Sequence, residues 1–506
     1  MLDNHSSAQN NLLARGHRSA LAMLVQKIVT PGITFAVTVL LARGLTEENY
    51  GTYGVFQGML PYFSLFATLG FVYAFSRFIP EYCSHGEMGL VKRLVSTGLL
   101  LALASGVLFV GLAFGLYRWL GAAFHVAGHR DSFMIFGIAM VLLFEATLLS
   151  QALNALFLHP YYAAAQIAYI AIKAALLSAT LALGWLTLKT AVWLEVVSAG
   201  LMLLILGISY GRKFSSKAVL TPRPPGERRR VTKYAAMSVV NEIGNVVFSR
   251  STDVLVISQF LGAVAVGPYY LAGQLTKYVD KLNVVALFQS VVTPMFFTQY
   301  TEDRTRTKEM FQLLVKLSLF TAVPVVCVYP SLGRPMIRLV VGARYDSTFT
   351  LVGIFIALTP LNALAYPSGL MLQALERLDQ IFYSRFFALY NLGLSVLLVR
   401  YYGVVGVAIS TASAMAFKNI YASFFACRLG NVRMPWGGIC RVVANSLVAG
   451  GAALVIVWVF DGLISIVIGV LVSVAVFLAM SRLNRAFDER ERELINRLLG
   501  RSLWRF

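Results

Sequence analysis

Apolar stretches of about 20 residues recur along the whole chain, separated by short segments rich in charged residues, glycine and proline. About 20 apolar residues are what a helix needs to cross the hydrocarbon core of a bilayer. The pattern therefore predicts an all-α, polytopic membrane protein with about fourteen transmembrane helices. The predicted spans lie near residues 19–43, 53–80, 93–117, 132–157, 162–185, 190–211, 234–260, 267–297, 309–332, 348–373, 382–400, 405–428, 441–460 and 463–482.

The longest connection between predicted spans runs from Arg212 to Lys233 and carries three prolines and a run of basic residues. It divides the chain into two six-helix lobes, which are followed by two extra helices. The expected segments are a cytoplasmic N-terminus (1–18), an N-terminal lobe (19–211), a cytoplasmic basic linker (212–233), a C-terminal lobe (234–428), two further spans (441–482) and a cytoplasmic basic tail (483–506).

A weak internal repeat links the two halves at a constant offset of 216 residues. The matching positions are Leu45 with Leu261, Gly51 with Gly267 and Tyr53 with Tyr269. Because each half contains an even number of spans, both halves start from the same side of the membrane. The repeat would then be parallel, with a pseudo-twofold axis along the membrane normal and a cleft between the lobes.

The composition excludes other classes of protein. The chain is 58% hydrophobic and only 13% charged, whereas a soluble protein is about 25% charged. Its four cysteines are scattered, no zinc or nucleotide-binding motif occurs, and no extramembrane segment is long enough for a soluble catalytic domain. We therefore expect a transporter without a cofactor, and any reaction would have to use residues inside the membrane.

The charge distribution predicts the orientation. The formal net charge is +20, and the loops assigned to one side carry 26 lysines and arginines against seven on the other. Basic residues are retained on the cytoplasmic side, so both termini are predicted to be cytoplasmic. Most of the positive charge is then a topology signal and a match to anionic membrane lipid, and nucleic acid is not expected as a partner.

Charged residues inside the spans point to the cargo. An ion at mid-bilayer is costly and usually faces the interior of a bundle. Those predicted near the midplane are Glu145, Lys173, Arg250, Asp253, Lys277, Asp280, Lys281 and Lys418, whereas Lys27, Arg77, Lys316 and Arg385 lie closer to the cytoplasmic boundary, where they could extend toward lipid headgroups. The excess of cations near the midplane favours an anionic cargo such as a phosphate or diphosphate.

The spacing of polar residues refines this hypothesis. Gln274, Lys277, Tyr278 and Lys281 recur at i, i+3, i+4 and i+7 and therefore share one helical face. Alternatively, such a face bonds neighbouring helices. The candidate residues for binding a diphosphate and its sugar are Lys27, Lys173, Arg250, Gln274, Lys277, Tyr278, Lys281 and Lys418.

Three acids are candidates for ion coupling. Asp253 stands three residues from Arg250, and Asp280 lies close to Lys277 and Lys281, so each could form a structural ion pair or a switch that takes up H+ or Na+. Glu145 has no cation within one helical turn, which makes it a candidate proton carrier. The membrane potential could also drive transport.

Five motifs give the chain a family resemblance. They are LLARGLTEENYGTYG (40–54), RFIPEY (77–82), STDVLVISQFLGAVAVGPYYLA (251–272), LVVGARYDST (339–348) and YYGVVGVAIS (401–410). With these motifs and fourteen predicted spans, the chain resembles the polysaccharide or oligosaccharide flippases of the multidrug/oligosaccharidyl-lipid/polysaccharide transporter superfamily.

The resemblance implies a bacterial inner-membrane protein that moves undecaprenyl-diphosphate-linked oligosaccharide to the outer leaflet by alternating access, through a cationic central cavity. It also suggests polysaccharide polymerase machinery as a partner. Two lobes that enclose their own cleft need no second subunit, so we expect a monomer. The alternatives are a multidrug antiporter of the same superfamily and a membrane polymerase or ligase of lipid-linked sugars.

Overall fold

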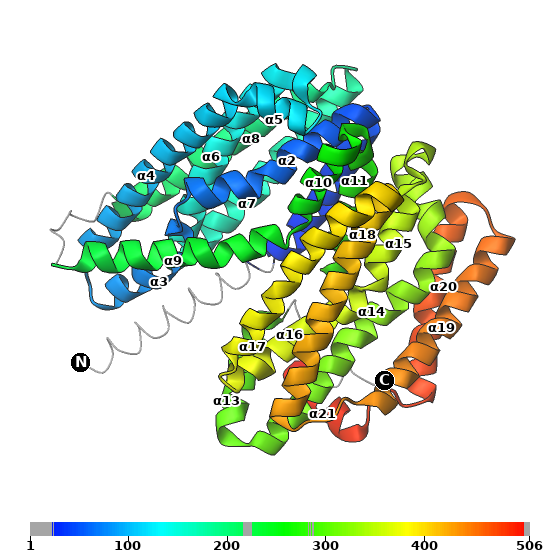
Figure 1. The fold of residues 1–506 in the computed structure, drawn as a ribbon. Coiled ribbons are helices and arrows are strands. Elements are labelled where there is room, and N and C mark those ends of the chain that lie inside the picture. The colour runs from blue at the N-terminus through cyan, green and yellow to red at the C-terminus, as the bar shows by residue number, and fades with distance from the viewer. Residues whose placement is uncertain are drawn as a thin grey trace. The chain divides into compact units, whose positions relative to one another are not determined.

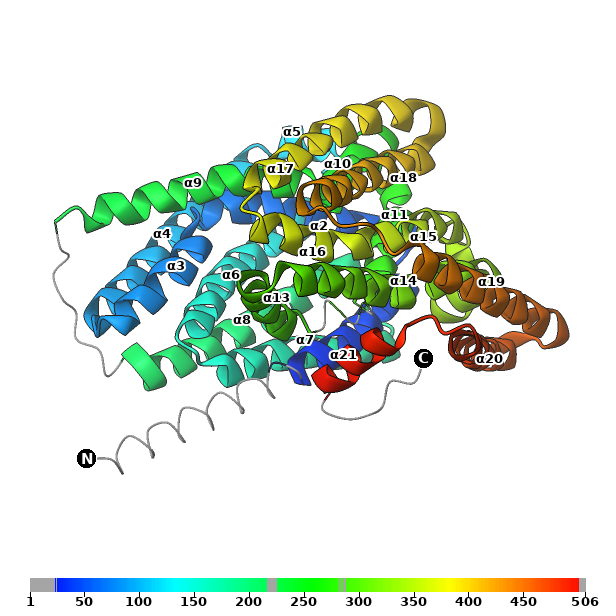
Figure 2. The ribbon, with the colours of Figure 1, turned by 90° about the horizontal axis from the view of Figure 1, so that it is seen from below.

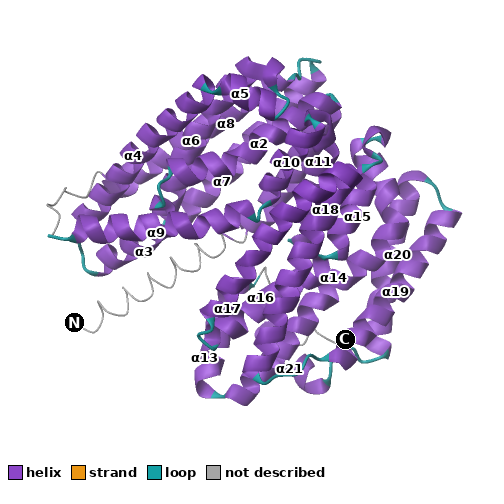
Figure 3. Cartoon of the chain, in the orientation of Figure 1, coloured by secondary structure: helices purple, strands orange, loops and turns teal. Residues whose placement is uncertain are grey.

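The computed structural model describes residues 23, 25–215, 225–281, 283, 285 and 288–499, and every regular element in these residues is a helix (Figures 1 and 3). The all-α prediction is therefore confirmed for the described part of the chain. The helices form two compact units, Met1–Gly267 and Pro268–Phe506. Helix α11 contributes residues to both of them.

The described part of the first unit contains long helices, several of them broken, and the short helix α5. Its elements are Val25–Gly44, α2 (Glu47–Ala67), α3 (Phe71–Ser84), α4 (Met88–Gly115), α5 (Tyr117–Ala123), α6 (Arg130–Ala155), α7 (His159–Ala182), α8 (Leu188–Tyr210), α9 (Glu227–Val247), α10 (Arg250–Leu261) and the start of α11 (Ala263–Asp280). The basic linker expected to end at Lys233 is shorter in the structure, because α9 begins at Glu227 directly after the left-handed residue Gly226.

The second unit continues α11 and adds α13 (Gln289–Glu302), α14 (Arg304–Val341), α15 (Thr348–Ala357), α16 (Thr359–Ala374), α17 (Leu378–Tyr383), α18 (Phe387–Gly430), α19 (Trp436–Val459), α20 (Gly462–Leu483) and α21 (Glu489–Leu499). Asp303 caps the start of α14 by accepting hydrogen bonds from the backbone N–H groups of Thr305 and Arg306, at 2.8 and 3.3 Å. Gly342 ends the helix with φ 97°, a conformation that favours glycine.

Within the described residues, ten helices are long and apolar enough to cross a membrane, or eleven if α2 and α3 form one bent span. The count is lower than fourteen for three reasons. The predicted spans 382–400 and 405–428 lie in the single element α18, which turns at Gly403. The predicted span 234–260 is broken between α9 and α10, and 267–297 contains two separate helices, α11 and α13. In the described residues, each of the fourteen apolar stretches contains helix, but several helices are bent or broken.

The two halves of α18 pack against each other (Figure 2). Asn391, in the first half, accepts hydrogen bonds on Oδ1 from the hydroxyls of Ser410 and Thr411 in the second half, at 3.1 and 3.2 Å. All three side chains are buried. Buried polar groups need such partners, so this cluster holds the two halves together.

The C-terminal helix α21 is anchored to the second unit. Phe487 and Ile495 are buried in its hydrophobic core, and Glu491 of α21 forms an ion pair with Lys316 of α14 at 2.5 Å. Lys316 therefore does not extend toward lipid headgroups, because its side chain is only 8% exposed and has a carboxylate partner. The residues after Leu483 are thus partly a docked helix rather than only a basic tail.

In the first unit, α2 and α3 run antiparallel to α10 and α9. α2 and α3 are separated by Leu69 and Gly70, which have φ of 49° and 74°, and their axes are bent by 52°. α9 and α10 are separated by Phe248 and Ser249. α9 packs on α3, and α10 packs on α2. Gly70 permits this packing, since a Cβ atom there would lie 2.2 Å from the carbonyl oxygen of Ala235.

Gly51 and Gly267, two of the repeat positions, lie where the start of α2 packs against the start of α11. A Cβ atom on Gly51 would lie 1.8 Å from the carbonyl oxygen of Ala263, and one on Gly267 would lie 3.3 Å from that of Glu47. Ala263 and Glu47 are themselves separated by the repeat offset of 216 residues. The contact is therefore reciprocal, as expected when two copies of one motif meet across a pseudo-twofold axis.

We predict that Gly51→Ala strongly destabilises the protein, because the added Cβ would meet a backbone carbonyl that cannot rotate away. Overpacking of this kind costs about 1–3 kcal/mol or more. The matched control is Gly111→Ala, which faces open space in α4. Thermal unfolding of the purified proteins in detergent tests the difference, and equal melting temperatures for the two variants would contradict the close approach.

Candidate functional site

A buried ion pair joins three helices of the first unit. The ammonium group of Lys173 on α7 contacts the carboxylate of Glu195 on α8. The same carboxylate accepts hydrogen bonds from the hydroxyl of Tyr53 on α2, at 3.1 Å, and from that of Tyr169 on α7. The side chains of Lys173 and Glu195 are only 7% and 2% exposed. Their charges are thus neutralised inside the unit.

This arrangement bears on the predicted cargo site. A diphosphate could bind the ammonium group of Lys173 only by displacing Glu195 from a buried position. Removing one member of such a pair leaves an uncompensated buried charge, which is strongly destabilising. The geometry therefore favours the alternative interpretation of Lys173, in which it links neighbouring helices.

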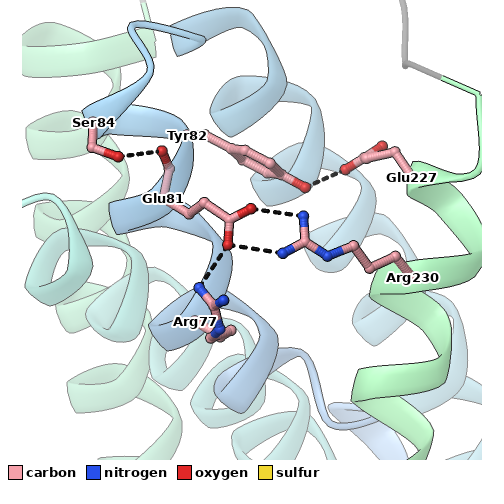
Figure 4. A network of polar contacts seen from close by, with 6 residues as sticks. All are labelled: Arg77, Glu81, Tyr82, Ser84, Glu227 and Arg230. Carbon is pink, nitrogen blue, oxygen red and sulfur yellow. Dashed lines mark hydrogen bonds and ion pairs between the residues drawn. The ribbon is translucent and has the colours of Figure 1, made fainter.

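A second polar network connects α3 with α9 near the start of α9 (Figure 4). The carboxylate of Glu81 accepts two hydrogen bonds from Arg230, at 2.6 and 2.9 Å, and one from Arg77, at 2.6 Å. The hydroxyl of Tyr82 donates to Glu227 at the first position of α9. Ion pairs and hydrogen bonds from adjacent residues of α3 therefore hold the first turn of α9.

Aromatic rings accompany this network. Arg230 lies 5.0 Å and Arg77 5.8 Å from the centre of the Phe78 ring. Tyr234 of α9 packs edge-on against the same ring at 5.4 Å. Guanidinium groups beside aromatic rings are typical of sites that bind planar or phosphorylated groups.

The predicted polar face of α11 forms the expected local pairs. Lys277 Nζ lies 3.5 Å from Gln274 Oε1, and Lys281 Nζ lies 5.7 Å from the centre of the Tyr278 ring. Both lysines are exposed. The cations of this face are therefore accessible, in contrast to Lys173.

The predicted coupling residues occupy different environments. Glu145 on α6 is 8% exposed, and its Oε1 atom has no hydrogen-bond partner among the described residues. Asp253 is buried in the first turn of α10, which begins at Arg250. Asp280 is the last residue of α11 and is partly buried. The role of Glu145 as a proton carrier stays a prediction.

The three remaining candidate cations lie apart along the chain, and Arg250 is partly buried at the start of α10. Lys27 is exposed on the helix Val25–Gly44, and Lys418 is half-buried in α18. Across the described ranges, no group of three or more histidine, cysteine, aspartate or glutamate side chains could hold a metal ion.

Sequence reasoning missed several residues that the structure brings together. Glu195, Glu81 and Arg230 were not identified as functional candidates, and Tyr53 was noted only as a repeat position. Arg77 and Glu81 are four residues apart, so helical spacing could have revealed that pair. The partners Glu195 and Arg230 come from other helices, and spacing within one helix carries no information about them.

The fold defines the class of protein. The structure matches a lipid II flippase, MurJ, in an inward closed conformation with a TM-score of 0.70, covering 96% of this chain and 99% of that chain at 16% identity. It also matches a multidrug resistance MATE family transporter of the MOP superfamily in an inward-facing conformation, with a TM-score of 0.63, 13% identity and coverage of 81% and 98%. The protein is therefore a multi-pass membrane protein with the fold of this superfamily.

The family follows from the sequence. A profile of the polysaccharide biosynthesis protein family matches residues 17–300, which is more than half of the chain. The chain belongs to this family. A search of curated proteins gives no significant match.

We predict that Lys173→Met destabilises the protein by about 3–5 kcal/mol, because it leaves Glu195 buried without its cation. The double variant Lys173→Met/Glu195→Gln should recover part of this loss. Lys189→Met, on the exposed start of α8, is the control and should behave like the wild type. Thermal unfolding in detergent is the measurement, and a fully stable single variant would show that the pair is not structural.

Proposed function

We propose that this protein is a flippase that moves undecaprenyl-diphosphate-linked oligosaccharide from the cytoplasmic to the outer leaflet of the bacterial inner membrane. Membership of the polysaccharide biosynthesis family supports a cargo that contains sugars. The fold shared with a lipid II flippase supports transport of a lipid-linked molecule. Alternating access between two lobes is the mechanism by which such a fold would act.

The observation that carries this proposal is the exposed face of α11. Lys277 and Lys281 place two cations one turn apart, with Gln274 and Tyr278 beside them. Two ammonium groups can bind the two charges of a diphosphate, while an amide and an aromatic hydroxyl suit sugar hydroxyls. Arg250 and Lys418 are further candidates, whereas Lys173 is the weakest because Glu195 already neutralises it.

The membrane potential supplies a driving force for an anionic cargo. Moving two negative charges out of a negative interior releases about 4.6 kcal/mol per 100 mV. Coupling to H+ or Na+ is then an addition rather than a requirement. Glu145 is the first candidate for a proton, since it is buried and one oxygen lacks a partner; Asp253 and Asp280 are the others.

A multidrug antiporter is the second candidate, favoured by the likeness to a MATE family transporter. Exported drugs are commonly cationic, and exposed lysines on α11 would repel them. We therefore place this function behind that of a flippase. We further propose that both termini are cytoplasmic, that anionic lipid borders the basic loops, that the protein is a monomer and that polysaccharide polymerase machinery acts on its product.

Deleting the gene should cause lipid-linked oligosaccharide to accumulate, unpolymerised, on the inner leaflet. The wild-type gene should restore export, and Lys277→Gln/Lys281→Gln should not, although the protein should be present in the membrane at the normal level. Labelling of inner- and outer-leaflet oligosaccharide in intact cells and inverted vesicles measures this.

Lys189→Gln is the matched control, since it also neutralises an exposed lysine and should support normal export. Export by the double variant at the wild-type rate would remove the α11 face from the cargo site. Loss of drug resistance without accumulation of oligosaccharide would favour the antiporter instead.

A further inference from the structure

The network between α3 and α9 places two guanidinium groups on one carboxylate. Glu81 is the shared acceptor, with Arg230 at 2.6 and 2.9 Å and Arg77 at 2.6 Å (Figure 4). Its side chain is 17% exposed, whereas those of Arg77 and Arg230 are 50% and 51% exposed. The cations are therefore accessible from outside the network, while their acceptor is largely covered.

The surrounding charges favour an anion. Glu227 is the other acid of the network and accepts a hydrogen bond from Tyr82. Arg228, Arg229 and Lys233 are exposed on the first two turns of α9. Arg77 and the first two turns of α9 thus carry five cations, and a ligand with two negative charges would balance more of them than Glu81 does.

An aromatic surface adjoins the guanidinium groups. The Phe78 ring is contacted by both arginines and is stacked on Tyr82, with ring centres 6.1 Å apart and planes at 22°. Arginine pairs bind phosphate oxygens through parallel hydrogen bonds, and adjacent aromatic rings suit the apolar faces of sugars.

We propose that Arg77 and Arg230 form a loading site for a diphosphate, separate from the α11 face, and that the diphosphate binds by replacing Glu81. The exchange would also loosen the first turn of α9, since Arg230 then no longer bonds to Glu81 on α3. The hydrogen bond from Tyr82 to Glu227 and the buried packing of Val231 and Ala235 would remain. Exposed ion pairs are weak, so a doubly charged ligand can compete with one carboxylate. This proposal deepens the proposed function and rests on it for the identity of the cargo.

Breaks in the backbone separate both helices from the helices next to them in sequence, which permits a local movement of α9 against α3. Leu69 and Gly70 separate α3 from α2, and Phe248 and Ser249 separate α9 from α10. In contrast, the crossing at Gly51 and Ala263 is packed backbone to backbone. Gly70 also packs on the backbone of Ala235 in α9, so movement of α9 would be confined to its first two turns, before Ala235.

The test is binding of inorganic pyrophosphate to the full-length protein in nanodiscs, measured by calorimetry at constant ionic strength. Glu81→Gln removes the competing carboxylate and should tighten binding by roughly three- to tenfold, because the half-exposed pairs that it breaks are weak. Arg77→Gln/Arg230→Gln should abolish binding. The control Arg118→Gln neutralises an exposed arginine elsewhere in the unit and should bind like the wild type.

A distance measurement tests the loosening of α9 and needs no Glu81 variant. Spin labels at His85→Cys and Thr232→Cys, with the four native cysteines replaced by serine, report the separation of α3 and α9. Pyrophosphate should lengthen this distance in the otherwise unaltered protein but not in Arg230→Lys, which keeps the charge and loses the paired hydrogen bonds. Sulfate at the same ionic strength should have no effect.

Three results would overturn the proposal. The first is binding of pyrophosphate to Glu81→Gln that is no tighter than binding to the wild type, and the second is undiminished binding to the double arginine variant. The third is an equal change of the spin-label distance in nanodiscs of phosphatidylglycerol without pyrophosphate, which would assign the site to a phospholipid headgroup. Because these measurements do not involve export, they separate this site from the proposed function. Pyrophosphate could bind as described even if deletion of the gene left lipid-linked oligosaccharide unchanged.

Discussion

A charge inside an apolar bundle needs a partner, and the partners in this protein come from other helices. Lys173 meets Glu195 in the first unit, and Lys316 meets Glu491 in the second. Each ion pair joins two helices. A buried ion pair is stable only when its two groups keep a precise geometry, so it restricts how the two helices can shift against each other. Such pairs neutralise these two cations within the structure.

Two groups of exposed cations have different surroundings. Lys277 and Lys281 lie on one face of α11 with polar neighbours. Arg77 and Arg230 share a single carboxylate where α3 meets α9. A flippase for a diphosphate lipid needs sites that bind its charge transiently, and accessible cations with weak partners provide this better than buried pairs do. The close packing of Gly70 on Ala235 in the same unit confines any movement of α9 to its first two turns.

The sequence predicted the all-helical membrane fold, and each of the fourteen apolar stretches contains helix in its described residues, because helix length and hydrophobicity are local properties. It did not predict the break between α9 and α10, which depends on packing. It did place a connection between the spans 382–400 and 405–428, where α18 turns at Gly403. It identified Lys173 as a charge inside a span but missed Glu195, which is 22 residues away on another helix. Spacing shows neighbours within one helix, and it placed Gln274, Lys277, Tyr278 and Lys281 on one face for that reason.

The central claim is that the exposed cations serve an anionic, lipid-linked cargo. The most direct measurement is the rate at which purified protein in liposomes transfers a fluorescent undecaprenyl-diphosphate-linked sugar between leaflets while a membrane potential is imposed. The account predicts transfer that accelerates when the potential drives negative charge across and slows when the potential is reversed. Absence of transfer together with uptake of a cationic drug would contradict it.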